Sequence, residues 1–86
     1  MPFVYILKNE KGSFYIGSTV NLERRIKQHL QGNTITTKRM RAFELVFSQE
    51  YKELVDARKI EYKLKKLKRK DYIANIIKEG YIKMTA

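Results

Sequence analysis

YIGSTVNLERRIKQH, residues 15–29, passes from a strand through a Gly-Ser-Thr break into a basic helix. Asn21 is a favourable helix N-cap, and Leu22, Ile26 and Leu30 recur at helical spacing, so we expect a helix that begins near Leu22. The same helix carries the one histidine of the chain. This unit fixes where the second strand ends, and the remaining elements are predicted outward from it.

A strand and a tight turn precede this unit. FVYIL, residues 3–7, is a β-branched and aromatic run, and NEKG, residues 9–12, is typical of a type I turn that closes a three-residue hairpin loop. The resulting register places Tyr5 opposite Gly17, so Tyr5 and Tyr15 project from one face of the hairpin. The opposite face is predicted to hold Val4, Ile6, Phe14 and Ile16.

The rest of the chain predicts a loop, a strand and two helices. Residues 31–42 are polar and basic, and Glu44–Tyr51 alternates as a third strand should. A long helix is expected from Leu54 to about Lys68, and a final helix is capped by Asp71 and ended by Gly80. In the third strand we expect Leu45, Phe47 and Gln49 on one side. The apolar stripe of the long helix is expected to be Leu54, Ala57, Ile60, Leu64 and Leu67.

The predicted order is therefore β-β-α-β-α-α. It indicates an α+β fold, in which a small three-stranded antiparallel sheet is flanked by helices. Residues 1–86 suit one domain with a single modest core. The absence of cysteine excludes a disulfide framework and thiolate chemistry.

Charge is the strongest compositional signal. Nineteen Lys and Arg against nine Asp and Glu give a formal net charge of +10, which favours a polyanionic partner, with nucleic acid first. Solubility alone and an anionic membrane surface are weaker explanations. No apolar run approaches the roughly 20 residues of a membrane span, and no signal-peptide pattern is present, so we expect no membrane association and a cytoplasmic location.

The quoted stretch, with Tyr5 ten residues before Tyr15, resembles the GIY-YIG nuclease superfamily. It is most similar to small stand-alone bacterial members related to the nuclease domain of the excision-repair incision subunit, and the resemblance covers nearly the whole chain. The first triplet departs from the family pattern. Phe3-Val4-Tyr5 stands where the family has Gly-Ile-Tyr, so the tyrosine is kept and the glycine is not.

Glu61 is the first candidate site residue. It lies at the margin of the apolar stripe, where a carboxylate is costly unless it is paired or binds a cation. The residues alone leave two readings open, an ion pair with Lys65 one turn later and a metal ligand. The resemblance implies the second, with Glu61 holding one Mg²⁺ or Mn²⁺ ion that keeps most of its waters.

Tyr5 and Tyr15 form the next candidate pair. Either tyrosine alone would ordinarily be a packing residue of a small sheet. A phenol titrates near pH 10, so it acts as a base only where nearby cations stabilise the phenolate. The resemblance implies that Tyr5 activates water and that Tyr15 helps to orient the water and the phosphate.

Arg25 and His29 are four residues apart and share one face of their helix. The resemblance implies that Arg25 clamps a phosphate and that His29 completes the tyrosine network or shuttles a proton. Arg24 is expected on the solvated surface. The catalytic set that the resemblance implies is Tyr5, Tyr15, Arg25, His29 and Glu61.

A basic run occupies residues 63–70. Such runs are usually solvated faces, but with the cations of the 31–42 loop this one is suited to following a phosphate backbone. The role of Asn75 stays open. The residues expected to bind nucleic acid are Lys38, Arg39, Arg41, Lys65, Lys66, Lys68 and Arg69.

Three functions are compatible with these residues. The first is a metal-dependent DNA endonuclease acting in repair, recombination or processing. The second is a weak or inactive binding module for DNA or RNA, favoured by Phe3 in place of glycine, and the third is a basic structural protein of a ribonucleoprotein assembly. Since no attached DNA-binding domain is evident, we expect weak intrinsic affinity or a protein partner that supplies targeting.

Overall fold

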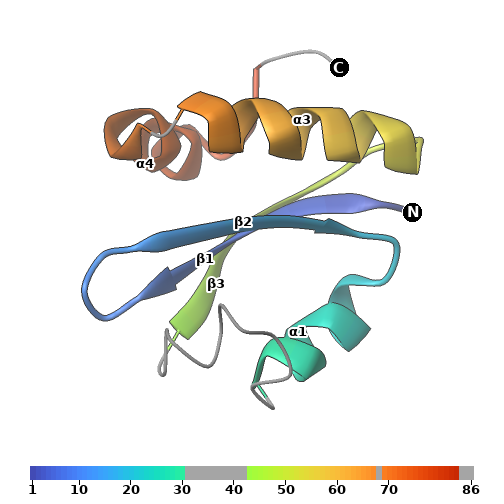
Figure 1. The fold of residues 1–86 in the computed structure, drawn as a ribbon, viewed down its shortest axis with the longest axis horizontal. Helices are drawn as coiled ribbons and strands as arrows, with labels where there is room; N and C mark the ends of the chain where they lie inside the picture. Colours follow the sequence, from blue (N-terminus) through green and yellow to red (C-terminus); the bar gives the residue numbers. More distant parts are fainter. Residues whose placement is uncertain (31–42, 68, 84–86) are drawn as a thin grey trace.

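A computed structural model of the protein describes residues 1–30, 43–67 and 69–83 (Figure 1). The element order β-β-α-β-α-α and the α+β class are confirmed. The predicted loop over residues 31–42 lies outside the described residues. The elements are β1 (Phe3–Asn9), β2 (Phe14–Thr19), α1 (Leu22–Leu30), β3 (Phe43–Glu50), α3 (Leu54–Leu67) and α4 (Lys70–Glu79).

The three strands form one antiparallel sheet in the order β2-β1-β3. The hairpin register is as predicted, with Tyr5 opposite Gly17 and Leu7 opposite Tyr15. The side chain of Asn9 organises the loop, because its Oδ1 accepts the backbone N–H groups of Lys11 and Ser13. An edge position for β2 leaves one side of this strand available to the helices and to solvent.

Helices cover both faces of the sheet (Figure 1). Helices α3 and α4 lie over one face, and α1 lies under the other. The main core fills the space between the sheet and the α3–α4 layer, as the alternation of β1 and β2 predicts. Its buried members are Val4, Ile6, Ile16, Phe47, Ala57, Ile60, Leu64, Ile73, Ile76 and Ile82.

The prediction for β3 is wrong in one respect. Leu45 and Phe47 were expected on one side, but Leu45 lies opposite Leu7 and Phe47 lies opposite Ile6, with an irregularity in the register between them. Since Ile6 and Leu7 point to opposite faces, so do Leu45 and Phe47. Phe47 joins the main core, whereas Leu45 is 41% exposed on the α1 side.

Helices α3 and α4 also differ in detail from what the sequence predicts. The apolar stripe of α3 ends at Leu64, because Leu67 is 41% exposed. Helix α4 begins one residue before Asp71, and its N-cap is Arg69, which makes no side-chain capping bond. Asp71 instead pairs with Arg69 at 2.7 Å. Gly80 ends the helix as predicted, with a left-handed φ of 84° and its N–H donating to the Ile76 carbonyl.

No helix in the described part of the chain is long and apolar enough to cross a membrane.

Candidate active site

The side chain of Tyr5 lies against Gly17 of the edge strand β2. The Tyr5 side chain is buried, and a Cβ added to Gly17 would lie 2.4 Å from the Tyr5 hydroxyl oxygen and 2.5 Å from Cζ. Any larger residue at position 17 would therefore displace the phenol. This contact explains the glycine of the Tyr-Ile-Gly triplet. A positive φ does not explain it, because Gly17 has none.

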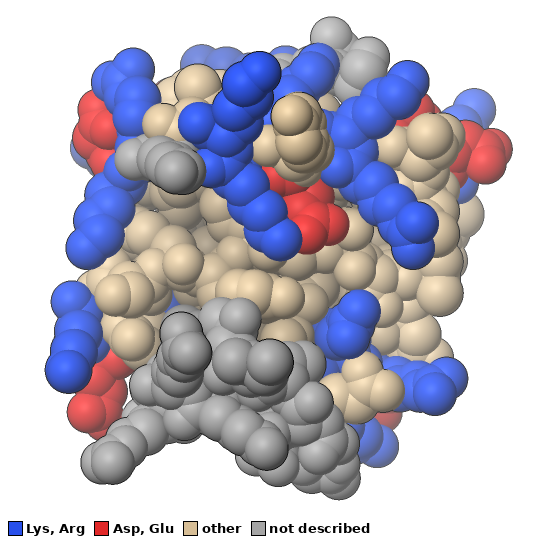
Figure 2. All heavy atoms as spheres, viewed as in Figure 1, with Lys and Arg blue, Asp and Glu red and all other residues tan. Residues whose placement is uncertain are grey.

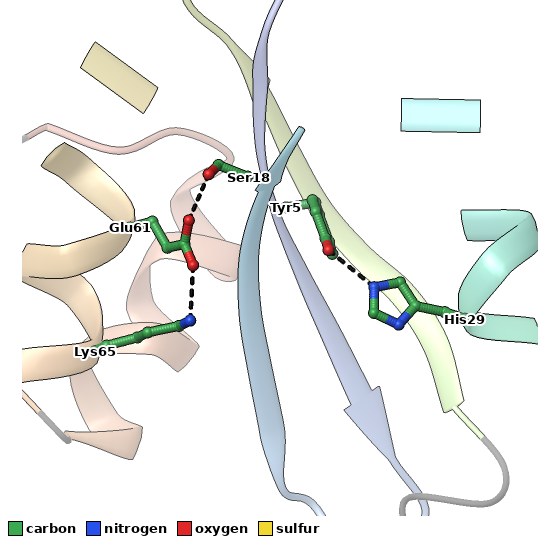
Figure 3. A network of polar contacts seen from close by, with 5 residues as sticks. All are labelled: Tyr5, Ser18, His29, Glu61 and Lys65. Carbon is green, nitrogen blue, oxygen red and sulfur yellow. Dashed lines mark hydrogen bonds and ion pairs between the residues drawn. The ribbon is translucent and has the colours of Figure 1, made fainter. Parts of the chain in front are cut away.

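The Tyr5 hydroxyl is hydrogen-bonded to Nε2 of His29 at 2.8 Å (Figure 3). His29 belongs to the last turn of α1, which starts where predicted because Asn21 Oδ1 accepts the Arg24 backbone N–H at 3.0 Å. Both side chains of the pair are only 1% exposed. The capped helix thus delivers the one imidazole of the chain to the buried phenol.

Tyr15 completes a cluster of three rings. Its centroid lies 6.3 Å from that of Tyr5 and 5.3 Å from that of His29, and both contacts are tilted or edge-on. The predicted shared face of Tyr5 and Tyr15 is confirmed. Tyr15 is only half-buried, so it stands between the buried pair and solvent.

Tyr5 and His29 are both neutral near pH 7. Burial, and then the neighbouring Tyr15 phenol, raise the pKa of Tyr5 well above its usual value, while the Arg25 charge opposes this shift. Burial and then the Arg25 charge lower the pKa of His29. The imidazole is thus held neutral and the phenol protonated, so His29 is available to accept the Tyr5 proton.

Arg25 lies beside this pair on α1, as its shared face with His29 predicts. Its side chain is half-buried, and Nη1 donates to Oε1 of Gln28 at 3.4 Å. Arg24 is exposed, as expected. The positive charge of Arg25 acts on both members of the pair, because it lowers the pKa of Tyr5 and the pKa of His29.

Glu61 lies on the other side of β2 from the Tyr5–His29 pair (Figure 3). Its Oε1 accepts the Ser18 hydroxyl, and its Oε2 pairs with Lys65 Nζ at 2.7 Å. The ion pair with Lys65, one of the two readings that the residues alone left open, is present in the structure. Lys65 also links the two sides, because its Nζ lies 5.6 Å from the centroid of the Tyr15 ring.

A divalent ion at Glu61 would need further oxygen ligands besides this one carboxylate. Within residues 1–30, 43–67 and 69–83, no group of three or more His, Cys, Asp or Glu side chains gathers, so these residues do not build an all-protein cage. A lone carboxylate with 20% of its side chain exposed fits an ion that keeps its waters and takes other ligands from a phosphate. The Lys65 ammonium is paired with Oε2, the oxygen that such an ion would need.

Lys and Arg side chains gather over the α3–α4 layer (Figure 2). Lys65, Arg69 and Lys70 line a groove of about 420 Å³ that also includes Phe14 and Tyr15. Lys66 is exposed on the same helix as Lys65. The other residues expected to bind nucleic acid lie outside the described residues: Lys38, Arg39, Arg41 and Lys68. Asn75, whose role the sequence leaves open, is exposed on α4.

Ser18 is a site residue that sequence reasoning missed. The hairpin register places it opposite Val4, on the α3 side, but Glu61 is 43 positions away and no local pattern joins them. Phe3, which replaces the glycine of the family triplet, lines a hollow under α1 with Val20, Leu22 and Ile26. Its ring is accommodated there, and the Tyr5–His29 bond is kept.

Residues 1–75 match the GIY-YIG catalytic domain. The chain belongs to the GIY-YIG nuclease family. It is 38% identical over 69 residues to UPF0213 protein YazA of Bacillus subtilis, covering 79% of this chain and 70% of that protein. It is 41% identical over 70 residues to UPF0213 protein CPE1444 of Clostridium perfringens, covering 80% and 75%.

A solved structure supports the same assignment. The solution NMR structure of UPF0213 protein BH0048 from Bacillus halodurans is similar to this GIY-YIG chain with a TM-score of 0.58 and 34% identity. The match covers 93% of this chain and 87% of that one. The resemblance inferred from Tyr5 and the Tyr-Ile-Gly triplet is therefore confirmed, as is the similarity to small bacterial members of the family.

Proposed function

We propose that the protein is a metal-dependent DNA endonuclease that hydrolyses a phosphodiester bond with water activated by Tyr5, in DNA repair, recombination or processing. The observation that carries the proposal is the buried hydrogen bond of 2.8 Å between Tyr5 and His29, together with the partly exposed carboxylate of Glu61 on the other side of β2. Proton transfer and cation binding need these two environments, and β2 keeps them apart.

Tyr5 and His29 would act together in the proton transfer. As the Tyr5 oxygen takes a proton from water, its own proton passes to Nε2 of His29, so the phenol does not have to exist as a phenolate at rest. This sequence requires His29 to carry its resting proton on Nδ1. The resulting hydroxide attacks phosphorus, and the O–P bond to the leaving oxygen breaks.

Arg25 and Tyr15 would position the phosphate. A guanidinium binds phosphate oxygens in pairs and stabilises the charge that grows in a five-coordinate transition state. The half-buried Tyr15 stands where the cluster meets solvent and would orient the water and the phosphate. Removing one such preorganised donor typically costs roughly 100- to 1000-fold in rate.

Glu61 would hold one Mg²⁺ or Mn²⁺ ion, with Ser18 fixing its other oxygen. Such an ion supplies Lewis-acid stabilisation to a phosphoryl oxygen when bound. Lys65 would leave Oε2 before Glu61 takes the ion, and its ammonium would then be available to a phosphate together with Lys66 and Arg69. In this proposal the substrate is bound largely through its phosphate backbone, which carries no sequence information. A protein partner would then supply the targeting.

The test is cleavage of labelled branched, nicked and single-stranded DNA with Mg²⁺ or Mn²⁺. Glu61→Gln and Tyr5→Phe should each lower the rate by roughly 100-fold or more while DNA binding is kept. Glu79→Gln is the matched control, because Glu79 is likewise paired one turn away, with Lys83 at 3.4 Å, but lies at the end of α4. Wild-type rates in Glu61→Gln or Tyr5→Phe would contradict the proposal.

A binding module for DNA or RNA is the second candidate. The observation that favours it is that both oxygens of Glu61 are already engaged, one by Ser18 and one by Lys65. Salt-sensitive nucleic-acid binding without metal-dependent cutting, in the wild type as in the variants, would select this function.

A further inference from the structure

Helix α3 has a second exposed face, which turns away from the sheet. Tyr62 is 66% exposed and Val55 is 57% exposed, although both are large and hydrophobic. They line a shallow hollow of about 460 Å³ with four cations. We call this the Tyr62 face, and its residues are Val55, Arg58, Lys59, Tyr62, Lys63 and Lys66.

Three of the four cations of this face are not paired with an acidic side chain of the described residues. In the part of the chain that the structure describes, Arg58, Lys59 and Lys66 join no ion pair, in contrast to Lys65, which is held by Glu61. Lys66 Nζ instead lies 6.0 Å from the centroid of the Tyr62 ring. Several like charges around one aromatic ring repel one another until an anion arrives, and the net charge of +10 adds to this repulsion.

A single exposed tyrosine needs no explanation by itself. An exposed ring with an apolar neighbour and four surrounding cations, however, combines the two features with which proteins bind single-stranded nucleic acid. These are a flat platform on which a base stacks and positive charges that follow the backbone. Duplex DNA offers no exposed base face, so it can use only the charges.

We propose that the Tyr62 face binds a short single-stranded segment of nucleic acid, with a base stacked on Tyr62 and phosphates contacted by Arg58, Lys59 and Lys66. The face extends over residues 55–66, or about 16 Å along the helix at 1.5 Å per residue, which suits a few nucleotides. Tyr62 follows Glu61 directly and points about 100° away from it around the helix. The face therefore lies beside the candidate active site, and Lys66 is the one residue that it shares with the proposed phosphate contacts there. The proposal does not depend on cleavage.

The test is the anisotropy of a fluorescent oligothymidine titrated with the full chain in EDTA, where no metal-dependent step occurs. Tyr62→Ala should weaken binding by roughly 5- to 150-fold, the range expected for loss of one base stack, whereas Tyr62→Phe should bind within about twofold of wild type. Tyr81→Ala is the matched control, since Tyr81 is 51% exposed and has Lys83 Nζ 5.8 Å from its ring centroid.

Unchanged binding by Tyr62→Ala would overturn the proposal. So would an equal loss in Tyr81→Ala, or an equal loss for a duplex of the same length, because either would assign the effect to charge or to general surface properties. Because the titration contains no divalent ion, a failure here leaves the proposed nuclease untouched. Likewise, a chain that does not cut DNA can still show binding that depends on Tyr62.

Discussion

Tyr5 of β1 and His29 of α1 each have 1% of the residue exposed, whereas Glu61 and Lys65 of α3 have 20% and 49% of their side chains exposed. The first pair is neutral and fixed by packing on all sides. The second is charged and held by one ion pair and one hydroxyl. A group that must pass a proton benefits from a rigid, dry partner, while a group that must exchange a counter-ion has to remain accessible.

This contrast indicates which half of the site is built in advance. The α1 side needs nothing further to align its donor and acceptor, since the bond already measures 2.8 Å. The β2 edge holds Lys65 where a divalent ion would bind, so it must rearrange. The predictions below therefore expect the buried side to respond to changes of shape and pH, and the exposed side to respond to changes of charge.

Gly17→Ala should produce the largest loss of stability. The added methyl group would lie 2.4 Å from the Tyr5 hydroxyl oxygen, and overpacking of this kind typically costs about 1–3 kcal/mol in the free energy of unfolding. Urea denaturation measures it. Combining Gly17→Ala with Tyr5→Ala removes the obstacle, so the double variant should lose less than the sum of the two single losses. A strictly additive result would mean that the contact is not the cause.

Ser18→Ala should come next. It removes a hydrogen bond to a partly buried carboxylate, for which a loss of about 1.5 kcal/mol in unfolding free energy is expected. Ser18→Thr keeps the hydroxyl and suits a strand, so it should unfold near the wild-type urea midpoint. If alanine and threonine behave alike, the hydroxyl does not hold Glu61.

Lys65→Met should raise the affinity of the protein for Mn²⁺. Removing the competing ammonium relieves an exposed ion pair worth up to about 1 kcal/mol, so titration calorimetry should show an increase of roughly fivefold. Lys66→Met removes the same charge from the next residue, which is not paired with Glu61, and should leave the affinity nearly unchanged. Weaker Mn²⁺ binding by Lys65→Met would contradict the competition.

His29 should make the fold less stable in mild acid. Because its pKa is lowered in the folded state, the unfolded chain takes up a proton first as the pH falls below about 6.5, and stability decreases until the pH passes the folded pKa. Thermal unfolding between pH 8 and pH 5 should show this decrease. His29→Gln should have a flatter profile over the same range, and an identical slope would place the titrating group elsewhere.

The sequence predicted those features that depend on neighbours in the chain. The NEKG turn and the alternation of β1 and β2 were enough to place Tyr5 and Tyr15 on one face, and Asn21 was enough to begin α1. The proximity of His29 to the two tyrosines could be expected because α1 directly follows β2 of that hairpin. These parts are short-range, so local patterns determine them.

Features that depend on distant partners were not predicted. The irregularity that separates Leu45 from Phe47 arises where β3 pairs with β1, and nothing in the sequence of β3 marks it. Ser18 meets Glu61 only because α3 packs on β2. The pKa shifts of Tyr5 and His29 follow from burial, which arises only when β1 and α1 pack together in the folded chain.

The central claim is that the two sides of β2 serve one reaction. Single-turnover cleavage of a branched DNA with Mg²⁺ tests it most directly, in wild type, Tyr5→Phe, Glu61→Gln and the double variant, with binding of the same DNA measured in EDTA. The account predicts metal-dependent cutting by wild type, losses of roughly 100-fold or more in each single variant, and a double variant no slower than the slower single one, because residues that act as a unit are not additive. A wild type that binds without cutting, or losses that multiply in the double variant, would contradict it.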